Sequence, residues 1–278
     1  MNEKLLKTYF GLYSSLAPKS AANTSFNLFQ KVRKKDIRPR EEAFYKSALH
    51  KKIDSVVGTI DTYCLGDISN PIIVLVHGWD SNAGSMSKIA FKMVDEGYQV
   101  LLFNLPGHAF DQNDKTNLVA CSLAMEAVLK AYDLKENFST ISHSFGSAVT
   151  AICLANTSLK ADKIVFLTNP NRIEKIFNSF QKMIGINKKS YKHLVERVEK
   201  ILGKDLNDVT VANNLEQASY NKLFIIHDKH DRVLDYSNSL EIIKQIPSTH
   251  LETFERIGHY KMLWNDEVID KCLSFMKE

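Results

Sequence analysis

The sequence predicts an α/β fold in which helices wind a mostly parallel, twisted sheet. From residue 56 onward, short apolar runs alternate with longer amphipathic segments. Runs that are apolar throughout are typical of strands buried on both faces, and their alternation with helices is typical of parallel sheets with right-handed crossovers. The expected strands are 72–76, 100–103, 138–141, 164–167, 223–226 and 251–254, with a looser candidate for an edge strand at 58–65. The expected helices between them are 85–96, 117–132, 145–155 and 236–245.

Two further segments lie outside this alternation. Residues 1–55 begin with apolar side chains at helical spacing, from Leu5 to Leu16, and we expect an N-terminal helical extension. The stretch 171–220 also has helical character and contains no strand run, and an insertion of this length is more typical of a lid than of a plain loop. The predicted organisation is an extension at 1–55, an α/β core at 56–170 and 221–278, and a helical cap at 171–220.

Charge is distributed unevenly along the chain of 278 residues. The formal net charge is +4, but residues 1–40 contain nine Lys or Arg and two acidic residues, which leaves −3 on the remainder. This balance argues against a nucleic-acid-binding body. A weak contact of residues 1–40 with an anionic membrane stays open, although we favour a packed helix followed by a solvated basic turn. Nothing in the sequence predicts the oligomeric state.

The four cysteines, Cys64, Cys121, Cys153 and Cys272, are far apart and belong to no Cys or His cluster. This spacing is not typical of a disulfide framework or a zinc site, and free thiols in a reducing cytoplasm are the expected state. Charged residues interrupt the apolar N-terminus, which argues against a secretory signal. No run approaches the roughly 20 apolar residues of a membrane-spanning helix. We therefore expect a cytoplasmic protein, and the motifs require neither metal nor cofactor.

The segment 141–147 has the pattern of a nucleophile elbow. It reads Ile-Ser-His-Ser-Phe-Gly-Ser, where a buried strand is expected to end and an apolar helix to begin. Small residues at Ser142 and Gly146 allow a sharp turn that exposes the central hydroxyl, that of Ser144, above the sheet. The alternative is an ordinary serine-rich helix start in which Ser144 only caps the helix. The strand–turn–helix context favours Ser144 as a nucleophile.

A second loop follows the strand at 72–76 and reads His-Gly-Trp. Catalytic loops of open α/β sheets follow the carboxyl ends of the strands. We expect the backbone N–H groups of Trp79 and Phe145 to form an oxyanion hole. His77 is expected to hold the loop rather than to catalyse. We also expect the substrate to be bordered by His77, Gly78 and His143.

A serine hydroxyl needs a base to act as a nucleophile at neutral pH. His259 is the favoured base, because it lies in a loop after the last expected strand. The base needs an orienting carboxylate. Asp231 is preferred over Asp228, because a few loop residues are needed to reach the neighbouring loop. His227 and His230 share the loop of the acid, which places them poorly as bases.

The chain order Ser144, Asp231, His259 resembles that of the α/β-hydrolase fold superfamily. The matching motifs, each after an expected strand, are HGW at 77–79, SHSFG at 142–146, HDKHDRV at 227–233 and GHY at 258–260. The resemblance covers about residues 56–278. Uncharacterised bacterial members with an HGW loop and a basic N-terminal extension resemble nearly the whole chain. The segment 104–111 is similar to a loop of the superfamily that usually reads Asp-x-x-Gly-x-Gly-x-Ser, but Asn104, Ala109 and Asp111 replace the usual residues.

The resemblance implies a serine hydrolase that cleaves a carboxylic ester or thioester of a small molecule through an acyl-enzyme. A serine at the elbow argues against dehalogenase or epoxide hydrolase chemistry, for which this fold uses an aspartate. Two alternatives stay open: a non-catalytic ligand-binding protein on the same fold, and an acyltransferase or peptidase with the same three residues. The acyl chain that the site accepts depends on how the cap folds, which periodicity does not predict.

Overall fold

The computed structural model describes residues 3–33 and 37–278, and the chain divides into two compact units. Unit 1 combines Met1–Lys31 with Arg172–Thr210, and unit 2 combines Val32–Asn171 with Val211–Glu278. Residues 34–36 of the basic run, like residues 1 and 2, lie outside the described residues. The N-terminal helices and most of the insertion therefore belong to one helical unit, and the sheet belongs to the other.

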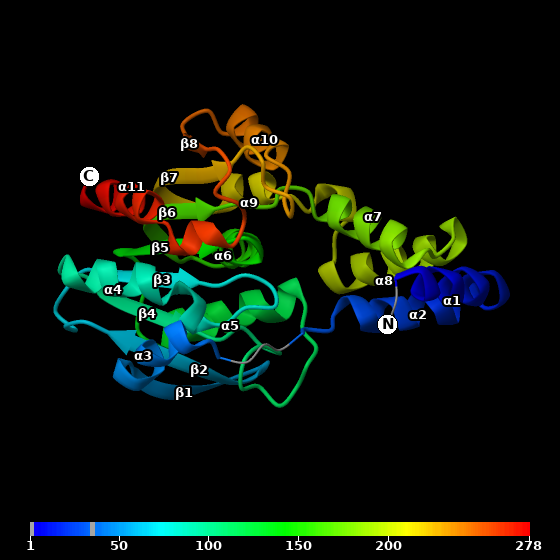
Figure 1. The fold of residues 1–278 in the computed structure, drawn as a ribbon, viewed down its shortest axis with the longest axis horizontal. Coiled ribbons are helices and arrows are strands. Elements are labelled where there is room, and N and C mark those ends of the chain that lie inside the picture. Colours follow the sequence, from blue (N-terminus) through cyan, green and yellow to red (C-terminus); the bar gives the residue numbers. More distant parts are fainter. Residues whose placement is uncertain (1–2, 34–36) are drawn as a thin grey trace. The chain divides into compact units, whose positions relative to one another are not determined.

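In the described part of unit 2, eight strands form one sheet with the order β1-β2-β4-β3-β5-β6-β7-β8 (Figure 1). The strands are β1 (Leu49–Ser55), β2 (Gly58–Leu65), β3 (Ile72–Val76), β4 (Gln99–Phe103), β5 (Phe138–His143), β6 (Lys160–Leu167), β7 (Ser219–Asp228) and β8 (His250–Phe254). The pairs β1–β2 and β2–β4 are antiparallel, and all other neighbouring pairs are parallel. This is the mostly parallel sheet that the apolar runs predict.

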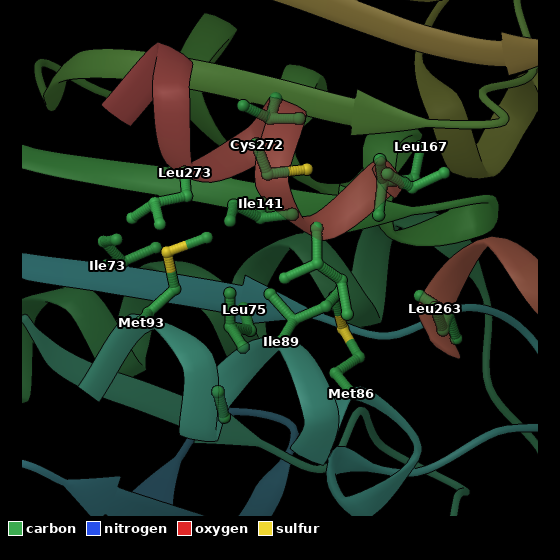
Figure 2. Packing of buried hydrophobic residues seen from close by; sticks show 14 of the residues in the cluster. Ile73, Leu75, Met86, Ile89, Met93, Ile141, Leu167, Leu263, Cys272 and Leu273 are labelled. Carbon is green, nitrogen blue, oxygen red and sulfur yellow. The ribbon is translucent and has the colours of Figure 1, made fainter. Parts of the chain in front are cut away.

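Helices cover the sheet and bury its apolar runs. Those of unit 2 are α3 (Pro39–Ser47), α4 (Ser87–Asp95), α5 (Leu118–Ala131), α6 (Phe145–Ala155), α9 (Val211–Gln217), α10 (Ser237–Gln245) and α11 (Asp266–Lys277). Ile73 and Leu75 of β3 pack with side chains of α4 and α11, including Ile89 and Cys272 (Figure 2). Helix α6 packs against both α5 and α9. Each fully buried aliphatic side chain in such a core contributes about 1.5–3 kcal/mol to folding.

Two elements differ from the predicted boundaries. Residues 49–55, which the sequence assigned to the helical extension, form β1 and pair with β2 over their whole length. Strand β1 rather than β2 is therefore the edge strand. Its side chains are mostly exposed and include three charges, as is usual for a protected sheet edge, so it lacks the apolar run by which the other strands were found. Residues 211–217, assigned to the cap, form α9 and pack against α6.

Unit 1 is a cluster of helices from two distant parts of the chain. Its helices are α1 (Glu3–Leu16), α2 (Pro18–Phe29), α7 (Ile173–Ile184) and α8 (Lys188–Leu202). The ring of Phe29 stacks on that of Phe177 with 4.2 Å between centroids, and the guanidinium of Arg197 lies 4.5 Å from the ring centre of Phe26. The side chain of Asn187 donates to the carbonyl oxygen of Ser14 at 2.9 Å. None of the described helices in either unit is long and apolar enough to cross a bilayer.

Candidate active site

A sharp turn between β5 and α6 holds Ser144. Its backbone has φ 54° and ψ −120°, a conformation that costs a non-glycine residue about 1–3 kcal/mol. The surrounding chain supports this strain, since the Ser144 N–H donates to the carbonyl oxygen of Leu167 on β6 at 2.9 Å. The serine thus stands at the N-terminus of an 11-residue helix, where the helix dipole favours negative charge.

Close packing of two loops explains the glycine that follows the serine. A Cβ atom on Gly146 would lie 2.4 Å from the carbonyl oxygen of Val76 and 2.7 Å from that of His77. Only glycine therefore lets the elbow approach the end of β3 this closely. The first small position tolerates a side chain, because the hydroxyl of Ser142 is buried in a 2.7 Å hydrogen bond with that of Thr150.

Three side chains from three loops form one hydrogen-bonded chain. Ser144 Oγ lies 2.9 Å from His259 Nε2, and His259 Nδ1 lies 2.7 Å from Asp231 Oδ2. A carboxylate only accepts hydrogen bonds, so Nδ1 carries the proton of the neutral ring and Nε2 accepts from the serine hydroxyl. The side chains of His259 and Asp231 are 3% and 0% exposed. The structure thus brings together the three residues that the sequence proposed as nucleophile, base and acid.

Asp231 stays ionised in this buried position. Burial pushes the pKa of its carboxyl up, but the hydrogen bond and the electrostatic interaction with His259 outweigh burial and lower it. Its second oxygen accepts the backbone N–H groups of Val233 at 2.7 Å and Leu234 at 3.0 Å. These donors fix the carboxylate, so that one oxygen faces the imidazole.

Asp228 has a different task from the one weighed in the sequence. It is the last residue of β7, and its carboxylate accepts N–H groups of Gly258 at 2.6 Å, Arg256 at 3.2 Å and His230 at 2.7 Å. Burial pushes the pKa of Asp228 up, but these backbone donors hold it below its ordinary value. Asp228 thus holds the loop that carries His259. Sequence reasoning considered it only as a rival acid and missed this positioning role.

The ring of His77 ties two loops together. Its Nε2 accepts the N–H of Leu105 at 3.0 Å, and its Nδ1 lies 2.8 Å from the carbonyl oxygen of Gly78, so Nδ1 carries the proton. Burial holds the pKa of His77 well below its ordinary value. Both ring nitrogens are engaged with the backbone, which favours a positioning role for His77 over direct contact with a substrate.

The two residues expected to supply the oxyanion donors contact each other through their side chains. The indole of Trp79 meets the ring of Phe145 edge to face, with 5.0 Å between centroids. Phe145 is the first residue of α6, so its N–H has no acceptor within the helix. Among the described residues, the N–H of Trp79 has no protein acceptor either. Neighbouring Gly78 completes the loop, and a Cβ there would lie 3.1 Å from Ser144 Cβ.

His143 supports the loop of the base from below the elbow. It is 2% exposed, and its Nε2 donates to the carbonyl oxygen of His259 at 3.0 Å. Within the part of the chain that the structure describes, its Nδ1 is buried without a partner. Burial, with a smaller electrostatic effect of His259, lowers the pKa of His143 to about 3. The ring is therefore neutral at physiological pH.

This burial predicts a pH dependence of stability. An unfolded histidine titrates near pH 6.5, so between pH 6.5 and about 3 the unfolded chain binds the proton that folded His143 excludes. The free energy of unfolding therefore decreases as the pH is lowered below 6.5, by up to about 1.4 kcal/mol per pH unit for this residue. In urea titrations between pH 7 and pH 5, His143→Asn is expected to lose less stability than wild type. The control is His230→Asn, which replaces an exposed histidine. If stability depends equally on pH in wild type and in both variants, the effect does not come from His143.

The loop at 104–111 accommodates the three residues that differ from the usual pattern of the superfamily. Asn104 Oδ1 accepts the N–H of Ala83 at 2.9 Å, and Asp111 Oδ2 accepts the N–H of Gly107 at 2.7 Å. Ala109 has φ 47°, the left-handed conformation in which the superfamily usually places glycine. The replacements are therefore accommodated by new hydrogen bonds and by local backbone strain.

Several basic residues near residue 35 contact their own unit. Both Nε and Nη2 of Arg33 lie within 2.8 Å of the carboxylate of Asp80, the residue that follows Trp79. The guanidinium of Arg40 lies 3.9 Å from the ring centre of Trp264. These contacts anchor the segment after Lys31 to the sheet unit, which the charge pattern alone did not indicate.

Comparisons with known proteins agree with this architecture. A family model of the alpha/beta hydrolase fold matches residues 71–188. A Pyrococcus furiosus esterase is 17% identical, with a TM-score of 0.65 over 88% of this chain and 97% of its own. A carboxylesterase of the thaumarchaeon Nitrososphaera gargenis is 16% identical, with a TM-score of 0.64 over 82% of this chain and 98% of its own. An Exiguobacterium antarcticum esterase is 16% identical, with a TM-score of 0.64 over 83% and 100%.

No curated protein sequence matches the chain. Identities of 14–17% among the structural relatives establish the fold and not the reaction. The strand order, the elbow after β5 and the family model agree with one another. These agreements show that the chain has the α/β-hydrolase fold.

Proposed function

We propose that the protein is a serine hydrolase that cleaves carboxylic esters or thioesters of small molecules. The observation that carries the proposal is the chain of hydrogen bonds from Asp231 through His259 to Ser144, a serine with strained backbone at the N-terminus of α6. A base on a serine hydroxyl, itself oriented by a carboxylate, is the arrangement that acyl transfer requires. The structural relatives named as esterases and carboxylesterases support an ester as the bond that is cleaved.

The geometry supports a two-step reaction. His259 Nε2 removes the proton as Ser144 Oγ attacks the acyl carbon, and the negative charge that develops on the carbonyl oxygen is held by the N–H groups of Trp79 and Phe145. The imidazolium then protonates the leaving group, and an acyl-enzyme remains. Water attacks the acyl carbon with His259 again as base, which releases the acid and the free serine. Asp231 stays ionised throughout and stabilises the imidazolium.

The oxyanion donors supply a large part of the rate. A donor aimed at the developing charge contributes about 3–4 kcal/mol to transition-state stabilisation. Both proposed donors are backbone groups, so their positions depend on the packing of Gly146 against β3 rather than on a side chain. Gly78 and His143 border the same turn, and we assign them to the wall of the substrate site.

A panel of p-nitrophenyl esters of increasing acyl length, with one acyl thioester, tests the function. We expect hydrolysis of at least one ester and covalent labelling of the protein by a fluorophosphonate probe at one serine, read by peptide mass spectrometry. If the protein shows no hydrolysis and is not labelled, it is a non-catalytic binding protein. Labelling without hydrolysis, together with acyl transfer to an added alcohol or amine, would identify an acyltransferase.

A further inference from the structure

Helix α1 has two opposite faces, and only one of them is covered. Phe10 and Ser14 are 3% and 0% exposed and face the other helices of unit 1. Four large apolar side chains point the other way: Leu5 is 64%, Tyr9 54%, Leu12 64% and Leu16 86% exposed. Their spacing of four, three and four residues places them on one side of a 3.6-residue helix. We call these four residues the α1 stripe.

The α1 stripe differs from the other exposed apolar side chains of the protein. Val56 and Ile68 in unit 2 are 88% and 86% exposed, but each is a single side chain in a polar loop or turn. Isolated exposed apolar residues are ordinary, whereas a continuous apolar row on one helix marks a surface that contacts something else. The apolar side chains at 5–16 predicted a packed helix, and the structure shows that Phe10 is packed whereas the α1 stripe is exposed.

The unit that carries the α1 stripe is strongly basic. Unit 1 contains 13 Lys or Arg and 6 Asp or Glu, a net charge of +7, so unit 2 carries −3 of the total of +4. The charge therefore separates along the division into units rather than along the first 40 residues. An apolar helix face on a cationic body matches a surface with an apolar interior and an anionic outer layer.

We propose that unit 1 docks on an anionic lipid surface through the α1 stripe. The leucines enter the boundary between headgroups and acyl chains, and Tyr9 lies at the level where aromatic rings of membrane proteins gather. Long-range attraction by the +7 charge brings the unit to the surface and weakens with salt. A second copy of the chain is a poorer partner, because two +7 units repel and a stable protein interface buries about 1,200–2,000 Å², more than one row of four side chains offers.

Vesicle sedimentation with the full-length protein tests the proposal. We expect wild type to bind vesicles of mixed phosphatidylglycerol and phosphatidylcholine, and to bind vesicles of phosphatidylcholine alone much less. The double variant Leu5→Ser/Leu12→Ser should bind the anionic vesicles at least about tenfold more weakly, because it lacks two leucines that enter the lipid in wild type. The matched control Val56→Ser/Ile68→Ser removes two apolar side chains from unit 2 that are even more exposed than Leu5 and Leu12, and it should bind as wild type does.

Each possible result decides the proposal. All substituted positions are exposed, so thermal unfolding should match wild type; if the double variant unfolds early, Leu16→Ser alone replaces it as the test. Equal binding by wild type and the stripe variant overturns the proposal, as does equal binding to both kinds of vesicle. Concentration-dependent association in analytical ultracentrifugation that the stripe variant abolishes, without vesicle binding, would assign the face to a second copy instead. Hydrolysis of a soluble ester is measured in parallel and should not change.

Discussion

The variant Ser144→Ala is expected to lose about five to six orders of magnitude in kcat for ester hydrolysis. The hydroxyl lies 2.9 Å from His259 Nε2, and alanine leaves no oxygen atom there that could act as nucleophile. Folding should change little, because alanine keeps the same backbone and gives up one hydrogen bond worth about 0.5–1.5 kcal/mol. Steady-state kinetics and urea unfolding on the same preparation measure both effects.

A serine elsewhere on the same strand separates this effect from general damage. Ser139 lies on β5, near the end opposite to the elbow, and Ser139→Ala should retain wild-type kinetics and probe labelling. Retained hydrolysis or retained labelling in Ser144→Ala would remove Ser144 from its proposed role. This outcome leaves the proposed docking of unit 1 untouched, since vesicle binding is measured without a substrate.

Asp231→Asn is expected to lower kcat by about 10⁴ with little change in KM. The asparagine amide can donate to His259 Nδ1, which would move the ring proton to Nε2, the atom that must accept from Ser144. The backbone donors of Val233 and Leu234 still find an oxygen acceptor, so the loop should keep its place. Steady-state kinetics at several pH values is the measurement.

Asp228→Asn is the matched variant, and its expected effect is of another kind. Its carboxylate serves three backbone donors and does not contact the His259 ring, so the loss should be in stability, about 1–3 kcal/mol. Its kcat should fall far less than that of Asp231→Asn. A folded Asp228→Asn protein with the larger loss of kcat, beside an active Asp231→Asn, would reverse the two assignments.

The sequence predicts those features that depend on short stretches of chain. Strands β3, β4, β6 and β7 each contain at least four consecutive apolar residues, so their burial is visible in the sequence. The elbow is visible because Ser144 and Gly146 are two residues apart and follow an expected strand. Strand β1 was missed because its outward side chains include Lys51 and Lys52, as an edge strand tolerates.

Features that depend on distant partners could not be predicted. Asp228 holds the loop of His259 through backbone N–H groups of residues about 30 positions away. Because every non-proline residue has such a group, the types of the side chains do not reveal these contacts. The packing of Phe29 on Phe177 joins the extension to the insertion, and periodicity shows only that each helix has an apolar side. The charge pattern indicates a basic segment at 1–40, but it does not link that segment to Arg172–Thr210, which is also basic.

The construction of unit 1 from two segments also sets a waiting time during synthesis. Helices α1 and α2 leave the ribosome first, but the helices that bury Phe10 and Phe26 end only at Leu202. At a translation rate of about 5–20 residues per second, the interval between the two is roughly 10–35 s. During that interval α1 and α2 have only each other as native partners within their own unit. Whether these helices stay in solution during synthesis therefore depends on their polar surface and on the chaperones that bind nascent apolar segments.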